Sequence, residues 1–350
     1  MSDSRPRTVV SRLQARINHL ERLQHRDSGF VVEDANAALR DLYDGGPRPA
    51  SILLRRSFLA RSTFLMVEGD RDKTPRQKPP AARIVRSRGL ALRLELALVF
   101  AQQSRKNAGA RLLPVQAPGD DLGPINLFAT GTRRGGDTLY RKQRSAMRAD
   151  QVHNALEILA AEGLVELGTA GRNRFEPMWL CHEAGRRPGK DAARYTHVAP
   201  AERTVSIPVE FFTNGWIQVL TDSEIWAWLV FRSSGGMTSA DIHSAEGIEL
   251  TAVTRLGWYE LTRDAWDTHA MLDRFGMLTT QPGEVTTGVK DGQQIGVRLH
   301  ERQARVAFHQ LFEERLRLRQ DEQFDLFGVD PAHALGRGDG VVERAEFVHQ

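Results

Sequence analysis

The chain has 350 residues, of which 41% are hydrophobic and 26% are charged, and its formal net charge is +4. This length is sufficient for two or three compact domains. No apolar stretch approaches the roughly 20 residues that a membrane-spanning helix needs, and residues 1–12 lack the apolar core of a signal peptide. The single cysteine, Cys181, excludes an internal disulfide and cannot hold a structural zinc ion alone. We therefore expect a cytoplasmic protein that has no membrane partner.

The first 68 residues are predicted to form a small helical unit. In residues 8–25, Val10, Leu13, Ile17 and Leu20 are spaced by three and four, as on one face of a helix. This seam can either pair two protomers into a homodimer or pack on the following helices, which is the commoner outcome for so short a run. Further helices are predicted at 33–43 and 51–67. A basic, proline-containing linker, 69–85, follows, and we expect it to be extended and solvated.

One sequence pattern occurs twice in the chain. In each copy, apolar residues at helical spacing are followed by a glycine suited to a left-handed helix cap, and then by an extended run. The residues concerned are Val152, Leu156, Leu159 and Gly163 in the first copy, and Ala265, His269, Leu272 and Gly276 in the second. The extended runs are 164–167 and 277–280. A duplicated helix–glycine–strand joint is therefore predicted.

Each extended run leads through a polar, glycine-containing turn to a second short run, 175–180 or 295–299, which predicts a β-hairpin. Buried helices are predicted upstream, at 89–103 and 223–232. This order resembles a winged helix, so the predicted fold class is mainly α with small β-wings (α+β), as two tandem winged-helix domains. The predicted divisions are 1–68, 69–85, 86–185, 186–203, 204–301, a C-terminal helix at 302–320, and a mobile tail at 321–350.

The resemblance to a winged helix implies double-stranded DNA as a partner, because the last helix of a helix-turn-helix enters the major groove. In the first copy, Gln151 and Asn154 point away from the apolar face, and both amides can form paired hydrogen bonds to adenine. Basic residues that precede this helix, or lie in the turn of the hairpin, suit phosphate contacts. They are Arg133, Arg134, Arg141, Lys142, Arg144 and Arg148 before or at the start of the helix, and Arg172 and Arg174 in the turn. The alternative is a solvated basic face.

The second copy is a weaker candidate for reading DNA. Its outward positions are nearly neutral in sum, so a protein-contact or dimerisation face is an equally good interpretation. These positions are Arg263, Asp264, Asp267, Ala270 and Arg274.

The tail carries a second motif. Residues 323–327, Gln-Phe-Asp-Leu-Phe, resemble the bacterial sliding-clamp-binding pentapeptide, with Gln323, Asp325, Leu326 and Phe327 at its recognised positions. The resemblance implies the sliding clamp as a partner, and the alternative is that these side chains fold back on the second copy. Together, tandem winged helices and this peptide resemble the replication initiators of iteron-type plasmids. That family implies sequence-specific DNA binding at an origin and recruitment of the host replication machinery.

Two other functions remain open from the sequence. One is a transcriptional regulator, which would bind sites only in promoters and no clamp. The other is an interaction subunit resembling the tandem winged-helix proteins of chromosome-organising or defence complexes.

Enzymatic motifs are weak throughout the chain. Residues 185–191 depart from a P-loop in the spacing of their glycines and in the final residue. Cys181, His182 and His197 lack the spacing of a metal or nucleophile site. We therefore expect a protein that is not an enzyme and has no catalytic residues, no cofactor and no metal.

Overall fold

The computed structural model has two compact units, residues 1–307 and 308–350, and every residue described below belongs to the first. The described residues are 16, 18, 20, 32–62, 78–85, 89–105, 124–128, 138–171, 174–176, 178–186, 191–234, 248–250, 252–281 and 294–296. The predicted C-terminal helix, the tail and the pentapeptide 323–327 lie outside them. So does most of the predicted helix 8–25, although Arg16, Asn18 and Leu20 are helical.

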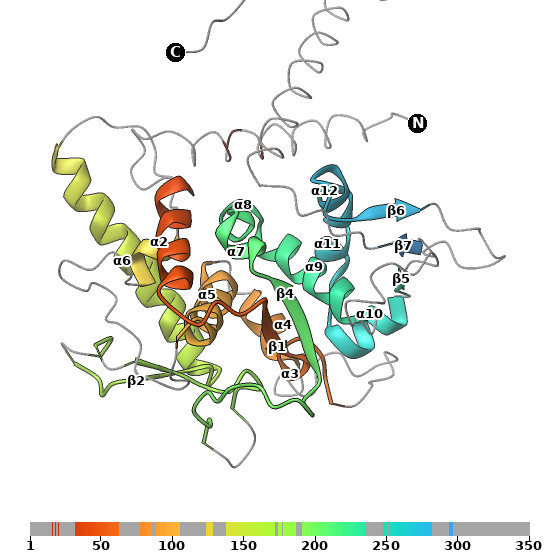
Figure 1. The fold of residues 1–350 in the computed structure, drawn as a ribbon, viewed down its shortest axis with the longest axis horizontal. Helices are drawn as coiled ribbons and strands as arrows, with labels where there is room; N and C mark the ends of the chain where they lie inside the picture. The colour runs from red at the N-terminus through yellow and green to blue at the C-terminus, as the bar shows by residue number, and fades with distance from the viewer. Residues whose placement is uncertain are drawn as a thin grey trace, which may run out of the picture. The chain divides into compact units, whose positions relative to one another are not determined.

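The described residues are mainly helical, with three small antiparallel sheets (Figure 1). None of their helices combines the length and apolarity that crossing a bilayer requires. The helices are α2 (Val32–Asp44), α3 (Arg56–Leu59), α4 (Pro80–Val85), α5 (Ala91–Gln103), η3 (Pro124–Leu127), α6 (Thr138–Ala161), α7 (Glu210–Thr213), α8 (Trp216–Val219), α9 (Asp222–Ser234), α10 (Ala252–Tyr259), α11 (Arg263–Trp266) and α12 (His269–Arg274). The strands are β1 (Ser51–Arg55), β2 (Val165–Leu167), β3 (Met178–Leu180), β4 (Thr204–Pro208), β5 (Ile248–Glu249), β6 (Thr279–Gln281) and β7 (Gln294–Gly296).

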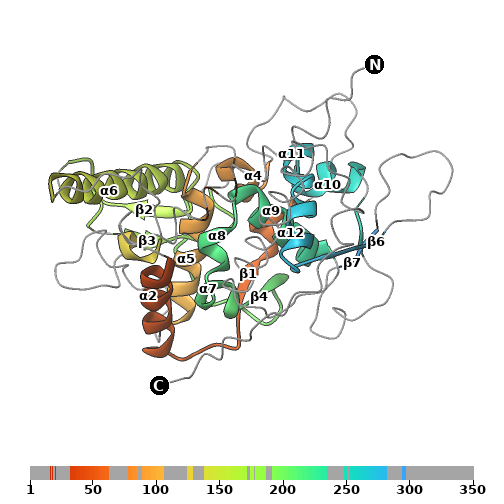
Figure 2. The ribbon, with the colours of Figure 1, turned by 90° about the horizontal axis from the view of Figure 1, so that it is seen from above.

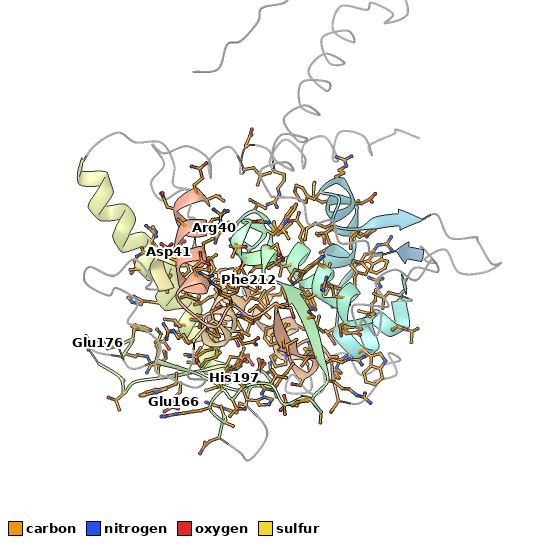
Figure 3. All side chains as sticks on the ribbon, in the orientation of Figure 1. Arg40, Asp41, Glu166, Glu176, His197 and Phe212 are labelled. Carbon is orange, nitrogen blue, oxygen red and sulfur yellow. The ribbon has the colours of Figure 1, made fainter. Side chains whose placement is uncertain are left out.

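The helices α5 and α9 form the core, as the sequence predicted for both. Every residue of α5 except Arg93 is buried, and α9 is buried from Glu224 to Ser233. Aromatic rings of α7 pack on both helices, since Phe212 stacks on Phe100 at 4.5 Å and Phe211 stacks on Trp228 at 4.6 Å between centroids. Phe212 accordingly lies in the interior of the ribbon (Figure 3). The predicted helix 33–43 is also confirmed, as α2.

The strands β1 and β4 pair across about 150 residues of sequence, from Ser51 opposite Pro208 to Arg55 opposite Thr204, and lie side by side in Figure 2. The predicted helix over 51–67 is therefore wrong for Ser51–Arg55. Leucine and arginine favour helices locally, but the pairing buries Ile52 and Leu54 completely on one face, and such tertiary packing outweighs a weak propensity. Among the described residues of that range, 51–62, residues 56–59 are helical, as α3.

Two further predictions were wrong at their edges. The linker 69–85 is not extended and solvated at its end, because α4 is a helix whose residues Pro80, Ala81, Ala82 and Ile84 are buried and which packs on α5 and α9. Proline suits the first position of a helix. The second copy is predicted from its sequence to open with an extended run at 204–212, but this run ends at Pro208, because α7 begins at Glu210. Elements on either side of the predicted domain boundaries contact one another, and the boundaries themselves stay predictions.

The duplicated joint is confirmed in both copies. Gly163 has φ +70° and Gly276 has φ +67°, the left-handed conformation that favours glycine. The amide after each glycine donates to the carbonyl five residues back, Leu164 to Leu159 at 2.8 Å and Met277 to Leu272 at 2.9 Å. Each glycine amide also donates to the carbonyl three residues back, which completes a Schellman motif.

Antiparallel hairpins follow both joints. In the first copy β2 pairs with β3, with Val165 opposite Leu180. In the second copy β6 pairs with β7, and β5 adds to the other edge of β7 to give the order β5-β7-β6. The last helix of the second copy is divided into α11 and α12, where the first copy has the continuous helix α6. The two copies therefore share a joint and differ around it.

Residues near the N-terminus contact α9. The guanidinium of Arg16 forms a 2.7 Å ion pair with Glu224 and donates to the carbonyl of Val219, and Leu20 is buried. Two of the three described positions of the predicted amphipathic helix, Arg16 and Leu20, thus pack within the same chain, whereas Asn18 is exposed. Packing within the chain is one of the two alternatives that the sequence left open.

Candidate nucleic-acid interface

The second half of α6 has one buried face and one exposed polar face. Asp150, Gln151 and Asn154 are exposed. The opposite face packs on α5, and its buried residues are Ala149, Val152, Ala155, Leu156 and Leu159. Gln151 and Asn154 therefore lie where the sequence predicted them, three residues apart on the same exposed surface.

The first hairpin is tied to α6 by two side-chain contacts. Arg174, which precedes β3, forms two hydrogen bonds to the carboxylate of Glu157, at 2.5 and 2.7 Å. His153 stacks on Phe175 with 4.1 Å between ring centroids and 13° between planes. The hydrogen bond from Arg174 lowers the pKa of Glu157, so the carboxylate is held in its charged form. Arg174 is thus paired within the protein, and its charge is partly neutralised.

The other predicted phosphate contacts divide into three groups. Arg141, Lys142 and Arg144 lie in the N-terminal half of α6. Arg148 is half-buried, and burial lowers the pKa of its guanidinium although the charge of Asp34 in α2 raises it. Arg133, Arg134 and Arg172 lie outside the described residues.

The corresponding face of the second copy is exposed and nearly neutral. The five positions predicted to point outward are all exposed: Arg263, Asp264, Asp267, Ala270 and Arg274. Arg263 lies 3.9 Å from Asp267 one helical turn away, a separation at which an exposed pair contributes little. This face carries as many acidic as basic residues, which disfavours a phosphate backbone as its partner.

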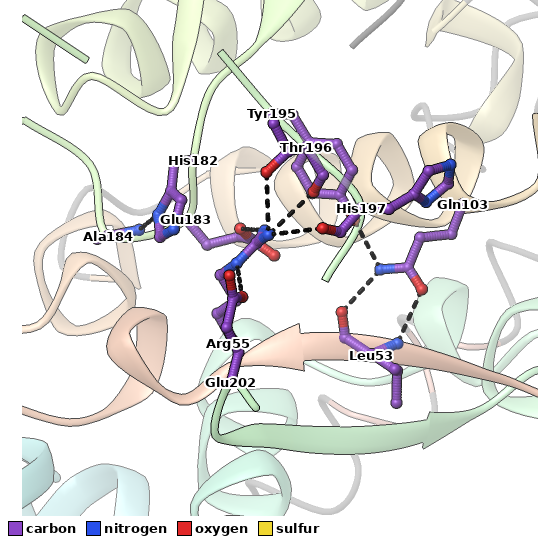
Figure 4. Close-up of polar contacts among 10 residues, drawn as sticks. All are labelled: Leu53, Arg55, Gln103, His182, Glu183, Ala184, Tyr195, Thr196, His197 and Glu202. Atoms are coloured by element: carbon purple, nitrogen blue, oxygen red, sulfur yellow. Dashed lines mark hydrogen bonds and ion pairs between the residues drawn. The ribbon is translucent and has the colours of Figure 1, made fainter. Parts of the chain in front are cut away.

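A buried ion network that sequence reasoning missed is centred on Arg55, the last residue of β1 (Figure 4). Its side chain is 3% exposed and forms ion pairs with Glu183, at 2.5 Å, and with Glu202. It also donates to the carbonyls of Thr196 and His197. Burial alone would lower the pKa of Arg55, but the two carboxylates raise it, and the net shift is upward. Arg55 therefore fastens β1 to the segment that leads into β4.

Gln103 and Tyr195 connect the Arg55 network to α5. The side-chain amide of Gln103 donates to the carbonyl of Leu53 at 2.7 Å and to the hydroxyl of Tyr195 at 2.8 Å, while it accepts from the amide of Leu53 at 2.9 Å. The guanidinium of Arg55 lies 5.4 Å from the centroid of the Tyr195 ring, within the range of a cation–π contact. These bonds join three parts of the sequence: the helix α5, the strand β1 and the loop that contains Tyr195.

Glu95, in the middle of α5, is fully buried. Burial, together with the charge of Glu183, raises its pKa well above the ordinary value, and neither of its carboxyl oxygens has a hydrogen-bond partner among the described residues. The available signal was an acidic residue within the apolar run Leu94-Glu95-Leu96, since such a residue is rarely buried without a reason.

Cys181 and its neighbours show no arrangement suited to nucleophilic or metal chemistry. Burial raises the pKa of the Cys181 thiol to about 12, so the reactive thiolate is scarce. His197 is exposed, and the ring of His182 accepts a hydrogen bond from the amide of Ala184 at 3.1 Å. Within the described ranges, no three His, Cys, Asp or Glu side chains are grouped as metal ligands.

Comparison with protein-family models, curated proteins and solved structures finds no match. The exposed face of α6, the charges around it and the architecture of the two copies are therefore the features that bear on function.

Proposed function

We propose that the chain is a sequence-specific double-stranded DNA-binding protein with two tandem winged-helix domains. The observation that carries this proposal is the exposed pair Gln151 and Asn154 on a helix that ends in a glycine cap and leads directly into a hairpin. In the second copy, the order α9, β5, α10, α11–α12 and β6–β7, with β5 paired to β7, supports the winged-helix assignment.

In this proposal, the exposed face of α6 enters the major groove. The amides of Gln151 and Asn154 each donate and accept one hydrogen bond at an adenine edge, and Asp150 beside them accepts from the amino group of a cytosine. Arg141, Lys142 and Arg144, nearer the start of the helix, contact phosphates and release counterions. Phosphate contacts fix the position of the protein, and the three side chains of α6 supply the specificity.

The proposed biological role is replication initiation, with binding to repeated sites and recruitment of the sliding clamp by Gln323, Asp325, Leu326 and Phe327. The chain would act by marking and deforming DNA and by recruiting other proteins, without catalysis. A transcriptional regulator uses the same interface and differs in where its sites lie.

The second candidate function, an interaction subunit of a larger complex, is favoured by one observation. The exposed face of α11 and α12 is nearly neutral, as Asp264 and Asp267 offset Arg263 and Arg274. Such a face suits a protein partner better than a phosphate backbone. The two proposals are compatible if the first copy binds DNA and the second binds protein.

A nuclease footprint of the purified full chain on the DNA that flanks its own gene, at near-physiological salt, tests the primary proposal. Protection of several spaced copies of one site is the expected result for an origin-binding initiator. A single protected promoter site would favour the regulator. Sequence-independent coverage that disappears with salt, or no protection, would contradict the proposed specificity.

Clamp recruitment is tested separately by a pull-down with a bacterial sliding clamp. Substitution of Leu326→Ala with Phe327→Ala is expected to abolish capture and to leave DNA affinity unchanged. Phe324→Ala is the matched control, because position 324 is not among the recognised positions of the motif and capture should persist. If the clamp is still captured after the Leu326 and Phe327 substitutions, the resemblance of residues 323–327 to the clamp-binding motif is accidental.

A further inference from the structure

A pocket of about 610 Å³ lies where the end of β1, the start of β4 and the end of α10 meet. Its volume falls within the range of about 300 to 1,000 Å³ that is usual for small-molecule sites. Four arginines line it, two of which are Arg56 and Arg203, and Trp258 forms part of the wall. It is separate from the exposed face of α6, and no residue of the DNA-binding proposal lines it.

Two of the four arginines have fixed structural roles. Arg55 is held by Glu183 and Glu202, as described above. Arg61 donates to the carbonyls of Leu256 at 2.7 Å and Gly257 at 2.9 Å, and pairs with Glu260. Glu260 itself has φ +58°, a backbone conformation that is rare and costly for a residue with a β-carbon. These interactions make the wall of the pocket rigid.

The other two arginines, Arg56 and Arg203, are held next to each other by their backbones, and neither has a carboxylate partner within the described part of the chain. The amide of Arg56 donates to the carbonyl of Arg203 at 2.9 Å. Arg56 is half-buried, and its guanidinium donates a hydrogen bond to the Tyr259 hydroxyl at 3.4 Å. Arg203 is exposed. Among the described residues, no carboxylate lies within ion-pair distance of either guanidinium. Glu202, the carboxylate in the lining, is engaged by Arg55.

Two guanidinium groups that line one pocket, without a carboxylate partner among the described residues, favour an anion that both can bind. Guanidinium groups form paired hydrogen bonds to phosphate, and such charge-assisted bonds are about twice as strong as neutral ones. An indole in the same wall adds a flat apolar surface on which an aromatic ring can stack. A mononucleotide combines these two features in a ligand of suitable size.

We propose that this pocket binds a nucleotide, with Arg56 and Arg203 on its phosphate and Trp258 beside its base. The ligand would contact the β1–β4 sheet and α10 together, and so would strengthen the connection between the start of the chain and the second copy. This function is independent of the DNA interface on α6.

Isothermal titration calorimetry of the full chain with adenosine 5′-monophosphate tests the proposal. Saturable binding is expected, with adenosine and inorganic phosphate each roughly tenfold weaker or more, because each lacks one of the two contacts. Arg203→Ala and Arg56→Ala should each weaken binding roughly tenfold. Arg263→Ala, which replaces an exposed arginine outside the pocket, should have no effect.

Because Arg203 is exposed, Arg203→Ala should fold even if Arg56→Ala does not, and its affinity can be measured in either case. Absence of saturable binding by adenosine, guanosine, cytidine and uridine monophosphates would overturn the proposal, as would equal affinity in wild type and Arg203→Ala. If Arg203→Ala instead weakens duplex DNA binding while mononucleotides do not bind, the phosphate that the pocket takes belongs to DNA, and the nucleotide proposal is wrong.

Discussion

The first and second helix–hairpin copies have the same joint and different exposed faces. Both end their last helix with a glycine in a Schellman motif and continue into an antiparallel hairpin. The first exposes Asp150, Gln151 and Asn154 on one long helix, whereas the second exposes a charge-balanced face on two short ones. Backbone geometry fixes the joint and leaves the exposed residues free to differ. Function must therefore be inferred from each face, because a shared fold does not imply a shared partner.

The basic residues at the start of α6 give the largest expected difference between the copies. The affinity of a protein for DNA falls as salt rises, and the slope of log affinity against log salt concentration is called the salt slope here. The triple variant Arg141→Ala, Lys142→Ala and Arg144→Ala should reduce the magnitude of this slope by about 2.7, because each phosphate contact contributes about 0.9. At 0.1 M salt this corresponds to a loss of affinity of up to roughly 500-fold. Fluorescence anisotropy with a labelled duplex at several salt concentrations measures both quantities.

Its matched control lies in the second copy. The double variant Arg263→Ala and Arg274→Ala removes two exposed arginines from α11 and α12 and should leave the salt slope unchanged. If the two variants changed the salt slope equally, the proposal that the first copy binds DNA and the second does not would be wrong.

Substitution of the glycine in the helix–glycine–strand joint is expected to have the next largest effect, which is on folding stability. Gly163→Ala places a β-carbon at φ +70° and 2.8 Å from the backbone nitrogen of Arg186. We expect a loss of about 2 kcal/mol or more in the free energy of unfolding, from left-handed strain and backbone overlap together. Urea denaturation measures it. Gly89→Ala, at a glycine with open space around it, should change stability by less than about 0.5 kcal/mol.

The left-handed caps could be predicted because they are local. A helical run, a glycine and an extended run within about 15 residues specify Gly163 and Gly276, and no distant contact is needed. The strand β1 could not be predicted in this way. Its partner β4 lies about 150 positions away, and without that partner the run Leu53-Leu54-Arg55-Arg56 favours a helix.

The candidate sites likewise differ in whether local sequence could predict them. The exposure of Gln151 and Asn154 followed from helical periodicity, since their positions relative to Val152 and Leu156 determine which way they point. The Arg55 network and the arginine-lined pocket each combine residues from β1, from the segment 182–203 and from α5 or α10. Nothing in the spacing of these residues shows that they meet, because only the folded chain brings them together.

Glu95 in the core is expected to limit stability above acidic pH. Its folded-state pKa is raised, so stability is fully present below the ordinary pKa of about 4.3 and is lost as pH rises toward the folded value. Glu95→Gln should remove this loss and stabilise the protein at pH 8 by on the order of 1 kcal/mol, because a buried charge without hydrogen bonds is costly. Thermal unfolding between pH 4 and pH 8 measures the difference.

The exposed Glu166 provides the control for Glu95. Glu166→Gln replaces a carboxylate on β2 that is half-exposed and paired with Arg194, outside the core, and should not stabilise the protein at pH 8. A Glu95→Gln variant with the wild-type pH profile would show that Glu95 is solvated or paired in solution.

The ion pair between the first hairpin and α6 gives the smallest expected effect. Because Arg174 is engaged by Glu157, Arg174→Ala should reduce the DNA salt slope by less than the about 0.9 of a full phosphate contact. Glu157→Ala should instead raise affinity for all sequences, since it frees the guanidinium. The double variant should resemble Arg174→Ala alone. A Glu157→Ala variant with unchanged affinity would show that Arg174 does not reach the DNA.

The most direct test of the central claim uses the single cysteine of the chain. Cys181 is buried and its thiol pKa is raised to about 12, so a maleimide should react mainly at a new, exposed thiol. Asn154→Cys and Ala270→Cys place one such thiol on the exposed face of each copy. Because Asn154→Cys removes one proposed base contact, the labelling rate of each variant is measured with and without the footprinted duplex at a concentration that saturates that variant. We predict that DNA slows labelling at position 154 strongly and leaves the rate at position 270 unchanged. Protection at 270 alone, or at neither position, would contradict the assignment of the DNA-binding face to α6.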